Sequence, residues 1–258
     1  MYGVNLEKTI KERKRLNQEE LTIFLHIPKT GGTTLNTIFR NQYDRSEFFD
    51  HESYQDELMK LEELTDEVKQ KLVAVSGHYY FGIHTQFTKP FNYFTILREP
   101  VDRVISAYYF LKNFPGYERV QTMTLEEFVL NEPEAQNMQT MLVSGDLHSN
   151  PSLQKAKEHL RNFKVVGVTE QFNETLFLLQ KEYGWIHIHY SRKNITKSRR
   201  QKSDIPPHVI ELINHYNSLD IELYEYSKQL LEERLEALTD EEKGQLEAFK
   251  IEQAQLDG

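Results

Sequence analysis

Cysteine is absent from the 258 residues, and no apolar run is long enough to cross a membrane. The absence of cysteine excludes disulfides, thiolate-ligated zinc, iron–sulfur clusters and thiol nucleophiles. The longest apolar runs, such as residues 21–27, fall far short of the roughly 20 residues of a membrane-spanning helix. Residues 1–16 also lack the apolar core of a signal peptide. We therefore expect a chain without a membrane span, cytoplasmic by default.

Positive charge is in the minority, because Lys and Arg number 31 against 40 Asp and Glu, for a formal net charge of −9. This balance disfavours a general nucleic-acid-binding protein, so we expect no nucleic-acid partner. The exception is the segment 192–202, RKNITKSRRQK, which contains basic residues and no acidic one. It indicates either a site for one anionic ligand or a solvated basic loop.

Apolar runs of strand length alternate with helix-like segments through the first three quarters of the chain. Strands are expected at 21–27, 72–75, 93–97, 165–168 and 185–190. The first run is continuously apolar, which is typical of a strand buried on both faces. Strands alternating with helices predict an α/β fold of three layers, α/β/α and P-loop-like, with a central parallel sheet.

Capping residues mark the starts of several expected helices. Thr33 or Thr34 is expected to cap the helix after the first strand, and Pro100 suits the first turn of a later one. Thr124 and Glu127 have the spacing of a capping box at the start of another helix.

The last fifty residues show a helical pattern and no further strand. Thr239 and Glu242 have the spacing of a second capping box, which would start a final helix. We therefore divide the chain into an N-terminal helix or arm at 1–20, a main domain at 21–237 and a C-terminal helical tail at 238–258. This tail packs on the domain, binds a partner or frays.

The segment 28–34, PKTGGTT, follows the first strand, at the sheet edge where parallel folds bind their ligands. Gly31 and Gly32 let the backbone approach an anion, the helix start offers N–H groups, and Lys29 adds a full charge. The alternative is an ordinary strand–helix turn. Because Lys29 precedes both glycines, the segment is not a Walker A loop, and a magnesium–ATP enzyme is disfavoured.

A second candidate anion site lies at Arg98 and Ser106. Arg98 ends the strand 93–97 at the same sheet edge, and Ser106 lies about two turns into the following helix. A guanidinium binds phosphate in a forked geometry, and a serine hydroxyl adds a donor. Arg98 with Glu99 alone would equally suit a structural ion pair. Together with the first loop, however, these residues predict a clamp for a ligand with two separated phosphate-like groups.

Two segments carry a resemblance to a known family. HIPKTGGTTL and ILREPVDRVISAYY resemble the 5′-phosphosulfate loop and the 3′-phosphate motif of sulfotransferases that use 3′-phosphoadenosine 5′-phosphosulfate (PAPS). The segments SGHYYF, NMQTMLVSG, VVGVTEQFNETLFLL and NSLDIELYEYSKQLLEER narrow the resemblance to the heparan sulfate 2-O/6-O-sulfotransferases. It extends over about residues 21–235, with the motifs in order.

The resemblance implies a PAPS-dependent O-sulfotransferase that needs no metal. The residues it implies for the 5′-phosphosulfate are Lys29, Thr30, Gly31, Gly32, Thr33 and Thr34. Those implied for the 3′-phosphate are Arg98 and Ser106. The basic segment around Lys197, Ser198 and Arg199 matches the part of such enzymes that closes over the nucleotide.

Among ten histidines, His78 resembles the general base of the family, and it follows the second predicted strand at the ligand edge. Histidine titrates near neutral pH and can accept a proton from a hydroxyl. A structural loop histidine is the alternative, and His84 is the reserve candidate for the base. His26 is expected beneath the segment 28–34, which we call the phosphate loop. His187 and His189 are expected on a surface strand, because no third metal ligand accompanies them.

The reaction implied is in-line transfer of the sulfuryl group to a hydroxyl of an acceptor, most simply a saccharide or polysaccharide. His78 would take the proton, while Lys29 and the loop N–H groups would stabilise the charge on the departing adenosine 3′,5′-bisphosphate. Two alternatives remain open: a magnesium–ATP-dependent small-molecule kinase, and a non-catalytic module that binds a nucleotide or a glycan.

The acceptor site is expected to form from segments 44–60, 79–90 and 112–150. Side chains there that suit a sugar, or equally a structural cover, are Tyr79, Tyr80, Phe81, Gln86 and Phe114. Animal members of the family are membrane-anchored and contain cysteine. This chain has neither feature and looks like a soluble bacterial relative, so heparan sulfate itself does not follow as the acceptor.

Overall fold

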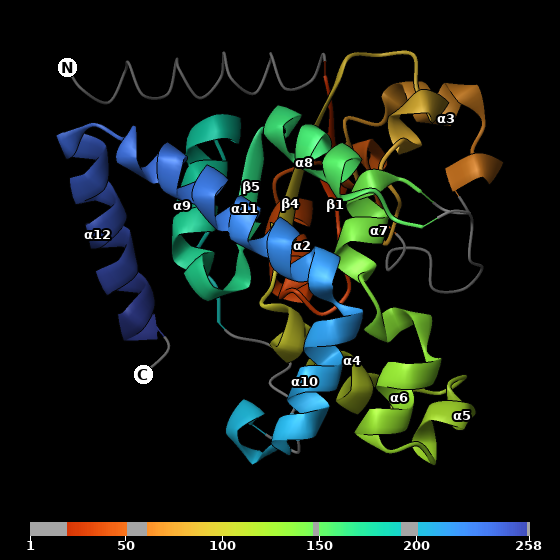
Figure 1. The fold of residues 1–258 in the computed structure, drawn as a ribbon. Coiled ribbons are helices and arrows are strands. Elements are labelled where there is room, and N and C mark those ends of the chain that lie inside the picture. Colours follow the sequence, from red (N-terminus) through yellow and green to blue (C-terminus); the bar gives the residue numbers. More distant parts are fainter. Residues whose placement is uncertain (1–19, 51–60, 147–149, 192–200, 257–258) are drawn as a thin grey trace, which may run out of the picture.

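The computed structural model describes residues 20–50, 61–146, 150–191 and 201–256. Within these residues, parallel strands form one five-stranded sheet in the order β2-β3-β1-β4-β5 (Figure 1). The strands are β1 Leu21–Leu25, β2 Phe48–Asp50, β3 Ala74–Gly77, β4 Phe91–Leu97 and β5 Val165–Val168. The predicted α/β class with a central parallel sheet is confirmed.

Helices surround this sheet. They are α2 Gly32–Arg40, α3 Asp66–Lys71, α4 Pro100–Leu111, α5 Glu118–Gln121, α6 Leu125–Asn131, α7 Met138–Ser144, α8 Leu153–Asn162, α9 Phe172–Tyr183, α10 Pro207–Tyr216, α11 Ser218–Glu236 and α12 Asp240–Leu256. In the view of Figure 1, α4, α5, α6 and α10 gather beyond one end of the strands. Apolar side chains of α4, α6 and α10 share a core of their own there.

Both faces of the sheet are buried, because side chains of successive strand residues point to opposite faces. On one face Phe94 of β4 packs edge-on against Phe39 of α2 and Trp185 after α9. On the other face Tyr93 stacks on Phe163, which follows α8. The sheet is therefore the middle of three layers, as the alternation of strands and helices predicts.

One expected strand is absent and one observed strand was missed. Residues 185–190 form no strand, and His187 has a positive φ of 55°. Trp185 and Ile188 are nevertheless buried, so the apolar pattern comes from packing on the core and not from strand pairing. The edge strand β2 has three residues, too few to show a period. The strand expected at 72–75 is instead Ala74–Gly77, although Leu72 is also buried.

The helix starts follow the expected caps with one exception. Pro100 is the first residue of α4, and a carboxylate oxygen of Glu99 accepts a bond of 2.7 Å from an N–H of its first turn. Thr124 and Glu127 form the predicted capping box. The expected cap of α2 by Thr33 or Thr34 is wrong, because this helix begins after Gly31, whose φ of 83° lies in the left-handed region.

The C-terminal helix α12 packs against α9. Leu246 and Phe249 are buried, and the Phe249 ring stacks on His189. Ion pairs of 2.8 Å from Lys181 to Glu242 and 3.0 Å from Lys250 to Glu174 flank this contact. In the described part of the chain no helix is both long and apolar enough to span a membrane. Most of the expected N-terminal arm, residues 1–19, lies outside the described residues.

Burial of Phe249 predicts that α12 contributes to the stability of the main core. Phe249→Ala is expected to lower the free energy of unfolding by about 3 kcal/mol, because it removes a buried ring and leaves a cavity. Leu256→Ala at the exposed end of the same helix is the matched control, with an expected change below about 0.5 kcal/mol. Denaturant unfolding measures both, and equal small effects would show that α12 is only loosely attached.

Candidate active site

The carboxyl ends of the three central strands bring the predicted site residues to one edge of the sheet. Leu25, the last residue of β1, pairs with Gly77 of β3 on one side and Thr95 of β4 on the other. The phosphate loop follows β1, His78 follows β3, and Arg98 follows β4. Parallel sheets bind their ligands beyond the carboxyl ends of the strands, so the order of the strands brings these three segments together at the candidate site.

The phosphate loop has a shape fixed by hydrogen bonds to its backbone. The Thr30 hydroxyl, which is buried, donates to the carbonyl oxygen of Ile27 at 2.9 Å. The hydroxyl of Thr169, just after β5, reaches the carbonyl oxygens of Thr30 at 2.7 Å and of Leu97 at 3.0 Å. Thr169 therefore fastens the loop to the end of β4. Its role was missed from the sequence, since its partners lie more than 70 residues away.

Gly32 is required because a buried histidine ring lies against it. A Cβ atom at this position would lie 1.8 Å from Nε2 of His26. The His26 ring also stacks on Phe24, with centroids 5.1 Å apart. Gly31 presents no side chain to cap α2, so the first N–H groups of this helix face the loop. A glycine turn leading into a helix N-terminus is a geometry that favours anions.

His26 is the buried neighbour of the exposed candidate base. The His26 and His78 rings lie 4.6 Å apart between centroids, and His78 is the more exposed of the two. Burial lowers the pKa of His26 well below its usual 6.5, and the nearby His78 and Lys29 lower it further. His26 is therefore neutral at pH 7. The expectation that it lies beneath the phosphate loop is confirmed.

The reserve candidate His84 lies at the opposite edge of the sheet. Its Nδ1 is 2.9 Å from the Tyr93 hydroxyl, and its ring stacks 3.9 Å from Phe91, the first residue of β4. Strand β4 thus separates His84 from the carboxyl ends of the strands. His187 and His189 lie in an exposed loop segment and not on a strand, and the described residues contain no cluster suited to a metal ion.

Lys29 and Arg98 connect the two predicted anion sites. The guanidinium Nη1 of Arg98 donates to the carbonyl oxygen of Lys29 at 3.1 Å. The Lys29 ammonium lies 3.7 Å from the ring centre of Phe110 on α4, a cation–π contact. Ser106 is buried on α4 one helical turn before Phe110. Thr33 and Thr34 lie in the first turn of α2, whereas Lys197, Ser198 and Arg199 lie outside the described residues.

Among the expected acceptor side chains, Phe114 lies next to Phe110, the ring that Lys29 contacts. Its exposed ring lies 5.1 Å from that of Phe110. Phe81 instead stacks 3.6 Å from His159, and Gln86 donates to Glu62 at 3.5 Å, away from the phosphate loop. A role of Phe81 and Gln86 in the acceptor site stays a prediction.

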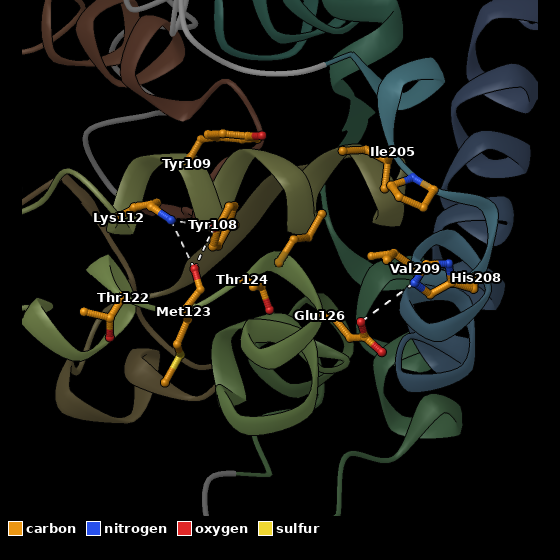
Figure 2. A pocket seen from close by; sticks show the side chains of 12 residues that line it. Tyr108, Tyr109, Lys112, Thr122, Met123, Thr124, Glu126, Ile205, His208 and Val209 are labelled. Carbon is orange, nitrogen blue, oxygen red and sulfur yellow. Dashed lines mark hydrogen bonds and ion pairs between the residues drawn. The ribbon is translucent and has the colours of Figure 1, made fainter.

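A pocket of about 590 Å³ lies on another side of α4, between α4, α6 and the start of α10 (Figure 2). Figure 2 shows Lys112 directed to Tyr108 and Met123, with bonds of 2.8 Å to the tyrosine hydroxyl and 3.1 Å to the methionine carbonyl oxygen. His208 faces Glu126 at 3.8 Å. Lys112 and residues 122–126, which belong to the expected acceptor segment 112–150, line this pocket. None of the residues predicted to bind the donor or to act as the base lines it in the described part of the chain.

Contact between residue 32 and His26 predicts a strict requirement for glycine. Gly32→Ala must displace the His26 ring, so we expect a loss of about 1 to 3 kcal/mol in unfolding free energy and a distorted loop. Gly244→Ala is the control, because its Cβ would meet nothing within 4 Å in α12. That change is expected to stabilise the chain by up to about 1 kcal/mol. An unchanged Gly32→Ala protein would contradict the packing.

The lowered pKa of His26 predicts acid sensitivity. Below about pH 6.5 the unfolded chain binds a proton at this position that the folded chain does not. As the pH is lowered further, the free energy of unfolding decreases by up to about 1.4 kcal/mol per pH unit, until the pKa of His26 in the folded protein is reached. Denaturant titrations between pH 7.5 and 5 should show a shallower fall for His26→Asn. His215→Asn, at an exposed position, is the control. If the free energy of unfolding depended on pH equally in the wild type and both variants, the lowered pKa of His26 would be disproved.

Comparisons with known proteins identify the family of this chain. A model described as the sulfotransferase family matches residues 15–227. Heparan-sulfate 6-O-sulfotransferase 3 of Mus musculus is 27% identical over 57% of this chain and 39% of its own length. Heparan-sulfate 6-O-sulfotransferase 1-B of Danio rerio is 23% identical over 86% and 69%, respectively. Heparin sulfate O-sulfotransferase of Drosophila melanogaster is 28% identical over 54% and 47%.

The chain thus spans less than half the length of two of these relatives and 69% of the third. The family match extends over most of the chain, and within it the phosphate loop and Arg98 meet at the ligand edge of a parallel sheet. This chain belongs to the sulfotransferase family.

Proposed function

We propose that the chain is a PAPS-dependent O-sulfotransferase that transfers a sulfuryl group to a hydroxyl of a carbohydrate. The observation that carries the proposal is the bond of 3.1 Å from the Arg98 guanidinium to the carbonyl oxygen of Lys29. It joins a glycine-rich anion loop to an arginine at the end of the neighbouring strand. A nucleotide with phosphate groups on both the 5′ and 3′ positions requires two such sites side by side.

The donor would lie along this edge. In the proposal Lys29, Thr30, Gly31, Gly32, Thr33 and Thr34 hold the 5′-phosphosulfate. Arg98 and Ser106 hold the 3′-phosphate, while Lys197 and Arg199 add positive charge and Ser198 adds a hydroxyl donor. The uncapped start of α2 supports the first part, because its N–H groups and dipole favour an anion. The buried position of Ser106 on α4, the helix that follows Arg98, supports the second.

His78 is the proposed general base. It accepts the proton of the acceptor hydroxyl while that oxygen forms a bond to sulfur and the bond from sulfur to the bridging phosphate oxygen breaks. Adenosine 3′,5′-bisphosphate leaves, with its developing charge stabilised by Lys29 and the loop N–H groups. The buried His26 ring beside His78 is neutral, so it does not oppose the positive charge that His78 gains.

A saccharide or polysaccharide is the proposed acceptor class. The named relatives act, by their names, on heparan sulfate or heparin sulfate. The exposed ring of Phe110 contacts Lys29, and the exposed ring of Phe114 lies next to Phe110, so an apolar sugar face can pack on an aromatic ring there.

Titration calorimetry tests the donor. The full chain is titrated with adenosine 3′,5′-bisphosphate, AMP and ATP, each without and with magnesium. We expect magnesium-independent binding of the bisphosphate and much weaker binding of AMP, because AMP lacks the 3′-phosphate. Preference for ATP with magnesium would instead assign a kinase, and no binding of any nucleotide would overturn the proposal.

Variants of the two proposed catalytic residues separate their roles. Lys29→Ala is expected to lower turnover by about 10²- to 10³-fold, the usual loss for a removed oxyanion stabiliser. His78→Ala should lose turnover and keep bisphosphate binding within about twofold, since it contacts the acceptor and not the nucleotide. Release of adenosine 3′,5′-bisphosphate from PAPS, with desulfated heparan sulfate as the acceptor, measures turnover. His215→Asn is the control, and full activity of Lys29→Ala would refute the assignment.

A further inference from the structure

Helices α7 and α11 cap each other. The side-chain oxygen of Asn137, which precedes α7, accepts bonds from the N–H groups of Leu219 at 3.0 Å and Asp220 at 3.2 Å in the first turn of α11. In return the Asp220 carboxylate accepts bonds from the N–H groups of Gln139 at 3.1 Å and Thr140 at 2.7 Å. The Thr140 hydroxyl adds a third bond of 2.7 Å. The start of α7 is thereby fixed in both position and direction.

This junction is buried and charged. Asp220 and Gln139 have no exposed surface, and Arg103 of α4 is 1% exposed. Asp220 and Arg103 attract each other, while burial raises the pKa of the carboxyl group and lowers that of the guanidinium. Together with the capping bonds, this attraction favours one defined geometry of the junction.

Gln139 connects this junction to the backbone of Arg98. Its side-chain oxygen accepts a bond of 2.9 Å from the N–H of Arg98, and its side-chain nitrogen donates one of 3.0 Å to the carbonyl oxygen of Arg98. Arg98 lies one residue beyond β4, where the sheet ladder has ended. The amide of Gln139 thus replaces the ladder and fixes the peptide groups on both sides of Arg98.

The other end of Arg98 is held as well, by the bond from its guanidinium to the carbonyl oxygen of Lys29. Backbone and guanidinium are therefore each tied to a different element, and the direction of the side chain between them is set. If the backbone of Arg98 turned, the guanidinium would swing away from the phosphate loop.

We infer that Gln139 is a positioning residue for Arg98, and that it determines the preference of the site for nucleotides carrying a 3′-phosphate. The inference rests on the proposed function, in which Arg98 binds this phosphate. It deepens that proposal by assigning 3′-phosphate selectivity to a residue that touches no substrate. The polar groups of the Gln139 side chain bond to Arg98, and a buried amide otherwise carries a desolvation penalty that an apolar side chain of equal size avoids.

The test is the selectivity ratio, the Kd for AMP divided by the Kd for adenosine 3′,5′-bisphosphate, measured by calorimetry on the full chain. Gln139→Met keeps the side-chain volume and removes both bonds to Arg98. We expect its ratio to fall about tenfold, the effect of a misplaced charge-assisted bond, with AMP affinity unchanged within about twofold. Thr140→Val is the matched control, because it removes one bond to Asp220 in the same junction and leaves Arg98 untouched. Its ratio should equal that of the wild type.

An Arg98→Ala background tests the route of the effect, since Gln139→Met should lower the ratio no further there. If Gln139→Met does not fold, Gln139→Asn retains the amide but is too short to make both bonds, and its ratio should fall in the same direction. An unchanged ratio, or an equal loss of AMP and bisphosphate binding, overturns the inference while the proposed function stands. A wild-type chain that binds AMP as well as the bisphosphate overturns the proposed function and this inference with it.

Discussion

The hydrogen bond between the Arg98 guanidinium and the carbonyl oxygen of Lys29 is the contact on which the site depends. Lys29, whose carbonyl oxygen accepts this bond, has a φ of 72°, a conformation that residues other than glycine rarely adopt. The contacts around it explain why the conformation persists. Thr30 ties its hydroxyl to Ile27, and Thr169 ties the carbonyl of Thr30 to the end of β4. The strained residue is held from both sides by bonds that a relaxed loop would break.

The phosphate loop has charged side chains on one side and a neutral ring beneath it. The positive groups Lys29 and Arg98 lie at the ligand edge, whereas the ring beneath the loop, His26, is neutral because burial lowers its pKa. A charged imidazole at that depth would carry a large desolvation penalty and repel Lys29. Close packing of His26 on Gly32 therefore provides shape without charge, and the positive charge beside the loop comes from Lys29 and Arg98.

Local patterns predicted much of the fold. The strand at Val165–Val168, the loop after β1 and the capping box at Thr124 were evident because each depends on neighbours within a few residues. Failures arose where tertiary contacts override local preference. Residues 185–190 have the composition of a strand but lack a partner, and their apolar residues are buried by packing alone. His78 and His84 lie six residues apart in one segment, and the pairing of the strands places them at opposite edges.

The junction around Gln139 is formed by two segments that the family resemblance singles out, NMQTMLVSG and NSLDIELYEYSKQLLEER, but the sequence does not show that the two segments meet. Its capping bonds join residues about 80 positions apart, so neither Asn137 nor Asp220 has a local signal for its role. A polar residue inside an apolar helical stretch is the signal that exists, and Gln139 in α7 has it, since a buried amide must find partners. The sequence does not show which groups bond to the buried amide of Gln139. In this fold the partner of this amide is the backbone of Arg98, because the sheet ends one residue earlier and leaves two peptide groups to be satisfied.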